Sequence, residues 1–191
     1  MENSENNGKS AFWNLAGIGG LALGGLSSAY LLISYLLTRL PSGNVAVNLI
    51  SSLGGVALWI AKIVACLALL KYFLKRYAST DTGIGNGDVF RFGSVVAILS
   101  ALIYAGFYMA YVTYFAPDTF SAVLELMADN PMVTEDALSQ MEELIPRLPV
   151  MSFFMNFIYC AIFGTVASAI YSRNIPSSNP FEGGGDDVQN Q

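Results

Sequence analysis

The sequence predicts an all-α membrane protein: a bundle of four transmembrane helices with an extracytoplasmic amphipathic helical hairpin between the third and fourth. Of 191 residues, 54% are hydrophobic and only 12% are charged, about half the usual charged share of a soluble domain. Four apolar stretches are long enough to cross a hydrocarbon core about 30 Å thick. The loops on one side of these stretches hold most of the basic residues, which indicates a fixed orientation.

The predicted spans cover residues 11–37, 47–70, 92–115 and 150–171, and Lys62 is the one charged residue within them. A helix rises 1.5 Å per residue, so about 20 residues suffice for a crossing. The first span could instead be a secretory signal cleaved near Ser27-Ser28-Ala29. Because the apolar run continues past this point, we expect an uncleaved signal-anchor.

Loop charges set the orientation, since basic residues stay on the cytoplasmic side. In a four-span topology six of them share one side: Lys9, Lys71, Lys75, Arg76, Arg91 and Arg173. The other side has only Arg39 and Arg147. We therefore expect both termini in the cytoplasm, with disordered polar ends at residues 1–10 and 174–191.

Residues 117–149 form an acidic loop that should face outward, with seven acids against one arginine. Asn130-Pro131 separates two apolar patterns of helical period, and Thr134 is suited to cap the second helix. We predict two short helices lying on the outer membrane face. The acids are typical of a solvated helix face; a divalent-cation site is the less favoured alternative.

Small residues recur at one-turn spacing in every span, which is typical of helices that pack closely in membranes. The expected packing positions are Gly17, Gly20, Gly24, Gly93, Ala97, Ala101, Gly164 and Ser168. Packing within the chain is the simpler use of these faces, and dimerisation is the alternative.

The composition excludes several chemistries. There is no histidine, and the two cysteines, Cys66 and Cys160, fall inside spans, so we expect no metal site and no catalytic residues. We also expect no cofactor. A net charge of -5 argues against nucleic acid as a partner.

Lys62 is the residue most open to a functional interpretation, because an intramembrane charge costs a few kcal/mol. Its stem could snorkel to the cytoplasmic head groups. It could instead turn inward, level with Gly19, Gly20, Ser100, Gly164 and Thr165, and in both cases we expect the ammonium to point cytoplasmically. The functional alternative is an anion or lipid head-group site that combines Lys62 with Lys71, Lys75, Arg76 and Arg91.

The layout resembles a bacterial membrane family, mostly from Bacteroidetes, numbered 4199 among the domains of unknown function. The resemblance rests on Phe90-Arg91-Phe92-Gly93 at the start of the third span, on Tyr111 to Asp118, and on the acidic segment and last span from Glu125 to Tyr171. It covers residues 12–175 and implies a multi-pass protein of the bacterial inner membrane. Family members found beside polyprenyl-phosphate glycosyltransferases imply a link to envelope glycolipids.

These observations favour a non-enzymatic accessory or scaffold subunit whose partners are membrane lipids, other membrane proteins or a second copy. The alternative is an anionic-lipid or polyprenyl-phosphate handling role in envelope glycolipid metabolism. A water-filled cavity around Lys62 would favour the alternative, and a dry bundle would weaken it. An enzyme is the least favoured class, because no catalytic constellation is visible.

Overall fold

The computed structural model describes residues 2–38, 45–80, 83–128 and 133–175, and these ranges contain helices and turns but no strand. The four long helices are α1 (Glu2–Thr38), α2 (Val45–Ala78), α3 (Asn86–Ala110) and α6 (Leu148–Arg173). Each contributes a segment long and apolar enough to cross a membrane: Ser10–Leu37, Gly54–Ala78, Asn86–Phe115 and Glu135–Arg173. The prediction of an all-α protein with four spanning helices is therefore confirmed.

Several helices run further than the apolar stretches that predict them. Helix α1 begins at Glu2. Residues 2–10, which were expected to be disordered, are therefore part of the helix. Once a helix is nucleated, each added residue gains a hydrogen bond, and no proline interrupts this segment. Helix α2 continues to Ala78, eight residues beyond Leu70. Most of the tail expected to be disordered, 176–191, lies outside the described residues.

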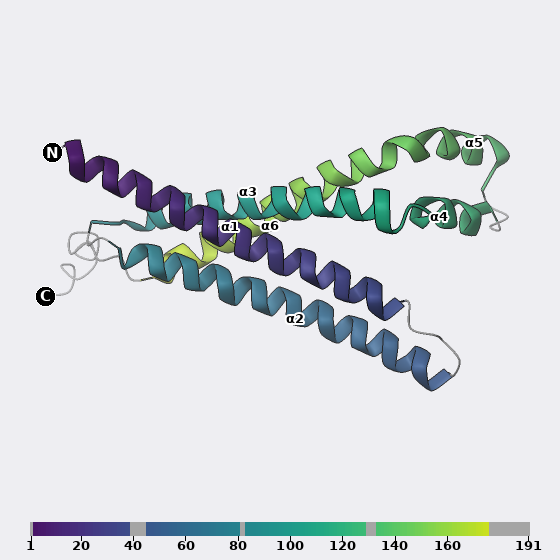
Figure 1. Cartoon of the computed structure of the whole chain (residues 1–191), viewed down its shortest axis with the longest axis horizontal. Coiled ribbons are helices and arrows are strands. Elements are labelled where there is room, and N and C mark those ends of the chain that lie inside the picture. The colour runs from purple at the N-terminus through teal and green to yellow at the C-terminus, as the bar shows by residue number, and fades with distance from the viewer. Residues whose placement is uncertain (1, 39–44, 81–82, 129–132, 176–191) are drawn as a thin grey trace, which may run out of the picture.

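The helices form two antiparallel pairs with α3 in the middle (Figure 1). Helix α3 packs along both α6 and α1, whereas α2 packs mainly on α1 and only lightly on α3 and α6. The start of α1, the end of α2, the start of α3 and the end of α6 lie at one end of the bundle, here called the terminal end (Figure 1). The opposite end is called the hairpin end.

The apolar core lies at the terminal end. Phe92 of α3 and Leu74 of α2 have no exposed surface, and Leu70 is 2% exposed. The Tyr77 and Phe92 rings stack with centroids 4.3 Å apart, and Phe12 of α1 meets both rings edge-on at 5.6 Å. Offset and edge-to-face pairs of this kind add to the burial of their area. They fix three helices against one another at this end.

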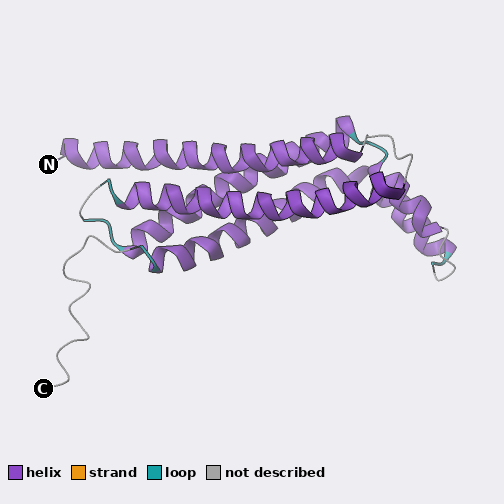
Figure 2. Ribbon diagram, turned by 90° about the horizontal axis from the view of Figure 1, so that it is seen from below, coloured by secondary structure: helices purple, strands orange, loops and turns teal. Residues whose placement is uncertain are grey.

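At the hairpin end α3 runs into a π-helical turn, η1 (Tyr111–Phe115), followed by α4 (Thr119–Ala128) and α5 (Glu135–Leu144). A 3-10 turn, η2 (Ile145–Arg147), joins α5 to α6 without a break. Thr134 caps α5, because its hydroxyl accepts the Ala137 amide at 3.4 Å. Helices α4 and α5 contact each other and lie beyond the end of the α3–α6 pair (Figure 1), where they bend to one side of the bundle (Figure 2). Their expected contact with the outer membrane face stays a prediction.

Candidate functional site: the Lys62 cavity

All four long helices contribute to a cavity of about 140 Å³ in the middle of the bundle. We call it the Lys62 cavity. Its polar lining consists of Ser27 from α1, Lys62 and Cys66 from α2, Ser100 and Tyr104 from α3, and Tyr159 and Cys160 from α6. The other lining residues are Leu23, Trp59, Ile63, Leu67, Leu70, Ala97, Phe163, Gly164 and Ala167.

The Lys62 ammonium lies between two tyrosine rings. Its Nζ is 4.5 Å from the ring centre of Tyr104 and 5.0 Å from that of Tyr30, within the range of cation–π attraction. Both rings belong to the interior of the bundle, and neither lies among the basic residues at the end of α2. The expected cytoplasmic direction of the ammonium stays a prediction.

One contact fixes the register that brings these rings to Lys62. The Ser27 hydroxyl and the Cys66 sulfur lie 3.6 Å apart, across α1 and α2. The two helices are antiparallel, so one turn before Cys66 on α2 lies level with one turn after Ser27 on α1. These positions are Lys62 and Tyr30, and Tyr104 meets them from α3.

The spans around Lys62 carry no acidic residue that could balance its positive charge. No Asp or Glu occurs in residues 10–80, 89–117 or 144–181, which include all four spans apart from their ends. A lysine at the centre of a span costs about 3 kcal/mol, and each desolvated cation–π contact returns about 2 kcal/mol. Two rings can therefore hold the charge inside the bundle. In the part of the chain that the structure describes, no hydrogen bond or ion pair reaches this ammonium.

The cavity opens sideways, between α2 and α6. The lining residues with large exposed fractions are Trp59 of α2 at 53%, and Tyr159 and Phe163 of α6 at 68% and 46%. Lining residues from α1 and α3 are buried or partly buried. The mouth therefore faces the hydrocarbon that surrounds the bundle.

The other four predicted basic residues lie apart from Lys62. Lys71, Lys75 and Arg76 are exposed near the end of α2, and Arg91 is exposed at the start of α3. Lys71 lies nine positions after Lys62, about 14 Å along the helix.

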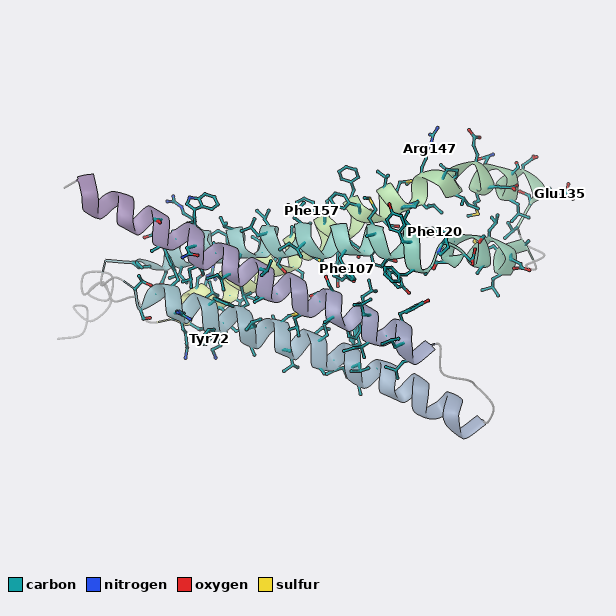
Figure 3. The ribbon with its side chains drawn as sticks, viewed as in Figure 1. Tyr72, Phe107, Phe120, Glu135, Arg147 and Phe157 are labelled. Carbon is teal, nitrogen blue, oxygen red and sulfur yellow. The ribbon has the colours of Figure 1, made fainter. Side chains whose placement is uncertain are left out.

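Three of these four basic side chains contact a neighbour at the terminal end. The Lys71 Nζ lies 5.9 Å from the Tyr171 ring centre, and Arg91 is 4.0 Å from the Asp88 carboxylate. Arg76 donates to the Tyr72 hydroxyl at 3.3 Å. Tyr72 itself projects away from the bundle (Figure 3). The structure thus separates the predicted five-residue set into one interior cation and four surface cations.

Most predicted packing positions lie where helices approach closely. A Cβ atom added at Gly20 would lie 2.6 Å from the Leu99 Cβ, and at Gly24 2.8 Å from the Ile103 Cβ. One at Gly164 would lie 2.6 Å from the Ala97 Cβ. Ala97, Ala101 and Ser168 are buried on the same interfaces. Gly17 differs: it is exposed, with nothing within 4 Å of an added Cβ, because α1 turns this side away from α3.

The family model described as a protein of unknown function, DUF4199, matches residues 19–173. The chain belongs to this family. The matched range begins inside α1, ends at the last residue of α6 and contains every residue that lines the Lys62 cavity. The expected resemblance is thereby confirmed. No curated protein and no solved structure matches the chain.

Tyr30, Tyr104 and Tyr159 are site residues that the sequence analysis did not place beside Lys62. Aromatic residues in spans are explained by interfacial belts, but Tyr30 lies eight residues before the end of α1, which is deep for such a belt. A tyrosine at this depth on one span, with Tyr104 at similar depth on another, is the signal that could have been used. No cluster of three metal-ligating side chains was found among the described residues.

Proposed function

We propose that this multi-pass membrane protein is a non-enzymatic lipid-binding protein that holds an anionic head group at the Lys62 cavity. The observation that carries the proposal is the interior ammonium, which lies beside a cavity and meets no carboxylate among the described residues. Two aromatic rings attract the charge, but they do not fill the role of a hydrogen-bond acceptor for its three N–H groups. A ligand oxygen in the cavity would supply such an acceptor.

The cavity lining supports this assignment. The hydroxyls of Ser27, Ser100 and Tyr104 can donate to an anion that also contacts Lys62. Hydrogen bonds to a charged acceptor are about twice as strong as neutral ones. The purely structural use of Lys62 would need none of these hydroxyls near it. A polyprenyl phosphate is one member of the ligand class, whereas a pure accessory or scaffold role would leave the cavity without a ligand.

The test compares two lysines of α2. Lys62→Met removes the interior cation, and Lys71→Met removes a surface cation near the end of the same helix. Native mass spectrometry of the full chain, purified with phosphatidic acid, would count bound lipid in each variant. We expect bound lipid to fall about tenfold in Lys62→Met, a change of about 1.4 kcal/mol. Lys71→Met should retain nearly all of it.

Equal retention in the wild type and Lys62→Met would overturn the proposal and favour the accessory role. An equal loss in both variants would also overturn it, because the basic terminal end would then be the binding surface.

A further inference from the structure

Resting on the proposed function, we infer that the ligand is a membrane amphiphile with a small anionic head, a carboxylate or a terminal phosphate that bears no further group. It reaches Lys62 sideways through the mouth between α2 and α6. Three features carry this inference: the position of the mouth, the closed terminal end and the size of the cavity.

The mouth is built from side chains that face hydrocarbon. Trp59 and Tyr159 are more than half exposed, and both line the cavity. Helices α2 and α6 contact each other far less than α3 contacts α6. A chain lying in this gap would have its polar end at Lys62 and its apolar end among lipid tails.

The terminal end is closed to water-soluble ligands. Leu70 and Ala167, which line the cavity on this side, are 2% and 7% exposed. Beyond them lies the apolar core with Leu74, Phe92 and Val96, none of which has exposed surface. An inorganic anion approaching from the basic end would have to cross this core without a polar contact. An inorganic anion would also be excluded at the mouth, because the surroundings of the mouth are apolar.

The size of the cavity limits the head group. Its volume of about 140 Å³ is below the range of about 300–1,000 Å³ that is typical for a whole small-molecule ligand. A cavity of this size suits a carboxylate or a terminal phosphate, whereas a phosphate that carries a further glycerol or sugar is larger. The apolar chain must therefore remain outside.

The outer wall of the mouth suits such a chain. The Tyr159 and Phe163 rings stack along α6 with centroids 6.5 Å apart and planes 17° apart. Both rings line the cavity from α6, and Trp59 lines it from α2. The chain would lie across these rings, and the head group would turn inward to Lys62.

Binding of two lipids with the same oleoyl chain tests the head-group limit. The full chain in detergent would be titrated with oleoyl lysophosphatidic acid, oleoyl lysophosphatidylglycerol and inorganic phosphate, with native mass spectrometry as the readout. We expect the small-headed lipid to bind about tenfold better than the larger-headed one. Inorganic phosphate should neither bind alone nor displace the lipid.

Two tyrosines that are both more than half exposed provide the matched variants for the route. Tyr159→Ser removes a mouth ring and should weaken oleoyl lysophosphatidic acid binding severalfold. Tyr72→Ser removes a ring outside the cavity and should leave binding unchanged. Equal losses would overturn the sideways route.

The outcomes separate this inference from the proposed function. If Lys62→Met abolishes binding of both lipids but the wild type binds them equally, the proposed function stands and the head-group limit is wrong. If inorganic phosphate binds as well as the lipid, the membrane route is wrong. If no binding depends on Lys62, both fail.

Discussion

The hydroxyl of Ser168 on α6 occupies the space beside Gly93 of α3. A Cβ atom at Gly93 would lie 2.6 Å from the Ser168 Oγ and 2.8 Å from the Leu74 Cδ2. Ser168 is fully buried and donates to the Gly164 carbonyl at 2.8 Å, so it cannot easily move aside. Three helices therefore meet at a position where a side chain has no room.

Gly93→Ala should destabilise the bundle by about 1–3 kcal/mol, the usual cost of inserting a methyl group into a packed interface. Gly106→Ala on the same helix is the matched control, because nothing lies within 4 Å of a Cβ there. Thermal unfolding in detergent should show a lower Tm for Gly93→Ala and not for Gly106→Ala. The double variant Gly93→Ala/Ser168→Gly should recover part of the loss, and equal Tm values for the two alanine variants would contradict the close contact.

A second prediction separates the ring of Tyr104 from its hydroxyl. Tyr104→Phe keeps the ring that faces Lys62, so it should leave stability nearly unchanged. Tyr104→Leu removes the ring and should cost about 1–2 kcal/mol if the cation–π contact is desolvated. In a Lys62→Met background the cost of Tyr104→Leu should shrink, and unfolding of all four proteins gives the coupling energy directly. A cost that is the same in both backgrounds would show that the ring acts only by packing.

Lys62→Met itself should fold and insert normally, with a Tm equal to or above that of the wild type. The change removes an interior charge that pairs with no carboxylate in the described part of the chain, and such charges are weak contributors to stability. The loss of two cation–π contacts works in the opposite direction but is of similar size to the insertion cost removed. Lys62→Arg keeps the charge and the ring contacts and serves as the comparison. A large fall in Tm for Lys62→Met would mean that the cation holds the helices together.

The sequence predicts the spans well because hydrocarbon selects for uninterrupted apolar runs. It also predicts which small residues of α3 and α6 lie at close contacts, since their spacing is that of a helix face. The register between helices is harder to predict, because it is set by side-chain contacts and cannot be counted from the helix ends. Counted from the ends of the predicted spans, Lys62 is level with Gly20 of α1. Both helices run past these spans, α1 back to Glu2 and α2 on to Ala78, and the neighbour of Lys62 on α1 is Tyr30.

The depth of residues on α3 and α6 relative to Lys62 was predicted better than the register with α1. Ser100 and Gly164 were expected beside Lys62, and both line the cavity. Thr165, the next residue of α6, does not line it. Small residues hold α3 and α6 close together. The position of one helix along the other is therefore set by their mutual packing. The mouth between α2 and α6 could not be predicted, because it reflects how little those two helices touch.

The hairpin helices give a further prediction. Thr134 caps α5 with its hydroxyl, and α5 carries Glu135 and Asp136 in its first turn, where the helix dipole favours acids. Thr134→Ala should cost about 1 kcal/mol of local helix stability. Hydrogen exchange in a bilayer should become faster across the first turns of α5 and stay unchanged in α6. Unprotected amides throughout residues 119–145 of the wild type would instead contradict a folded hairpin.

The last prediction concerns the side of the membrane to which each end belongs. Six basic residues belong to the terminal end and two to the hairpin end in a four-span chain, so the terminal end should be cytoplasmic. Ser79 lies after α2 at the terminal end, Ser139 lies on α5, and both are exposed.

Single cysteines at these positions, in a chain with Cys66 and Cys160 changed to Ala, would be treated with an impermeant maleimide in intact cells. The cysteine at Ser139 should label at once and that at Ser79 only after the cells are opened. Because the two sites lie at opposite ends of the same bundle, labelling of both from outside would contradict the four-span arrangement, and the reverse pattern would show that the orientation is inverted.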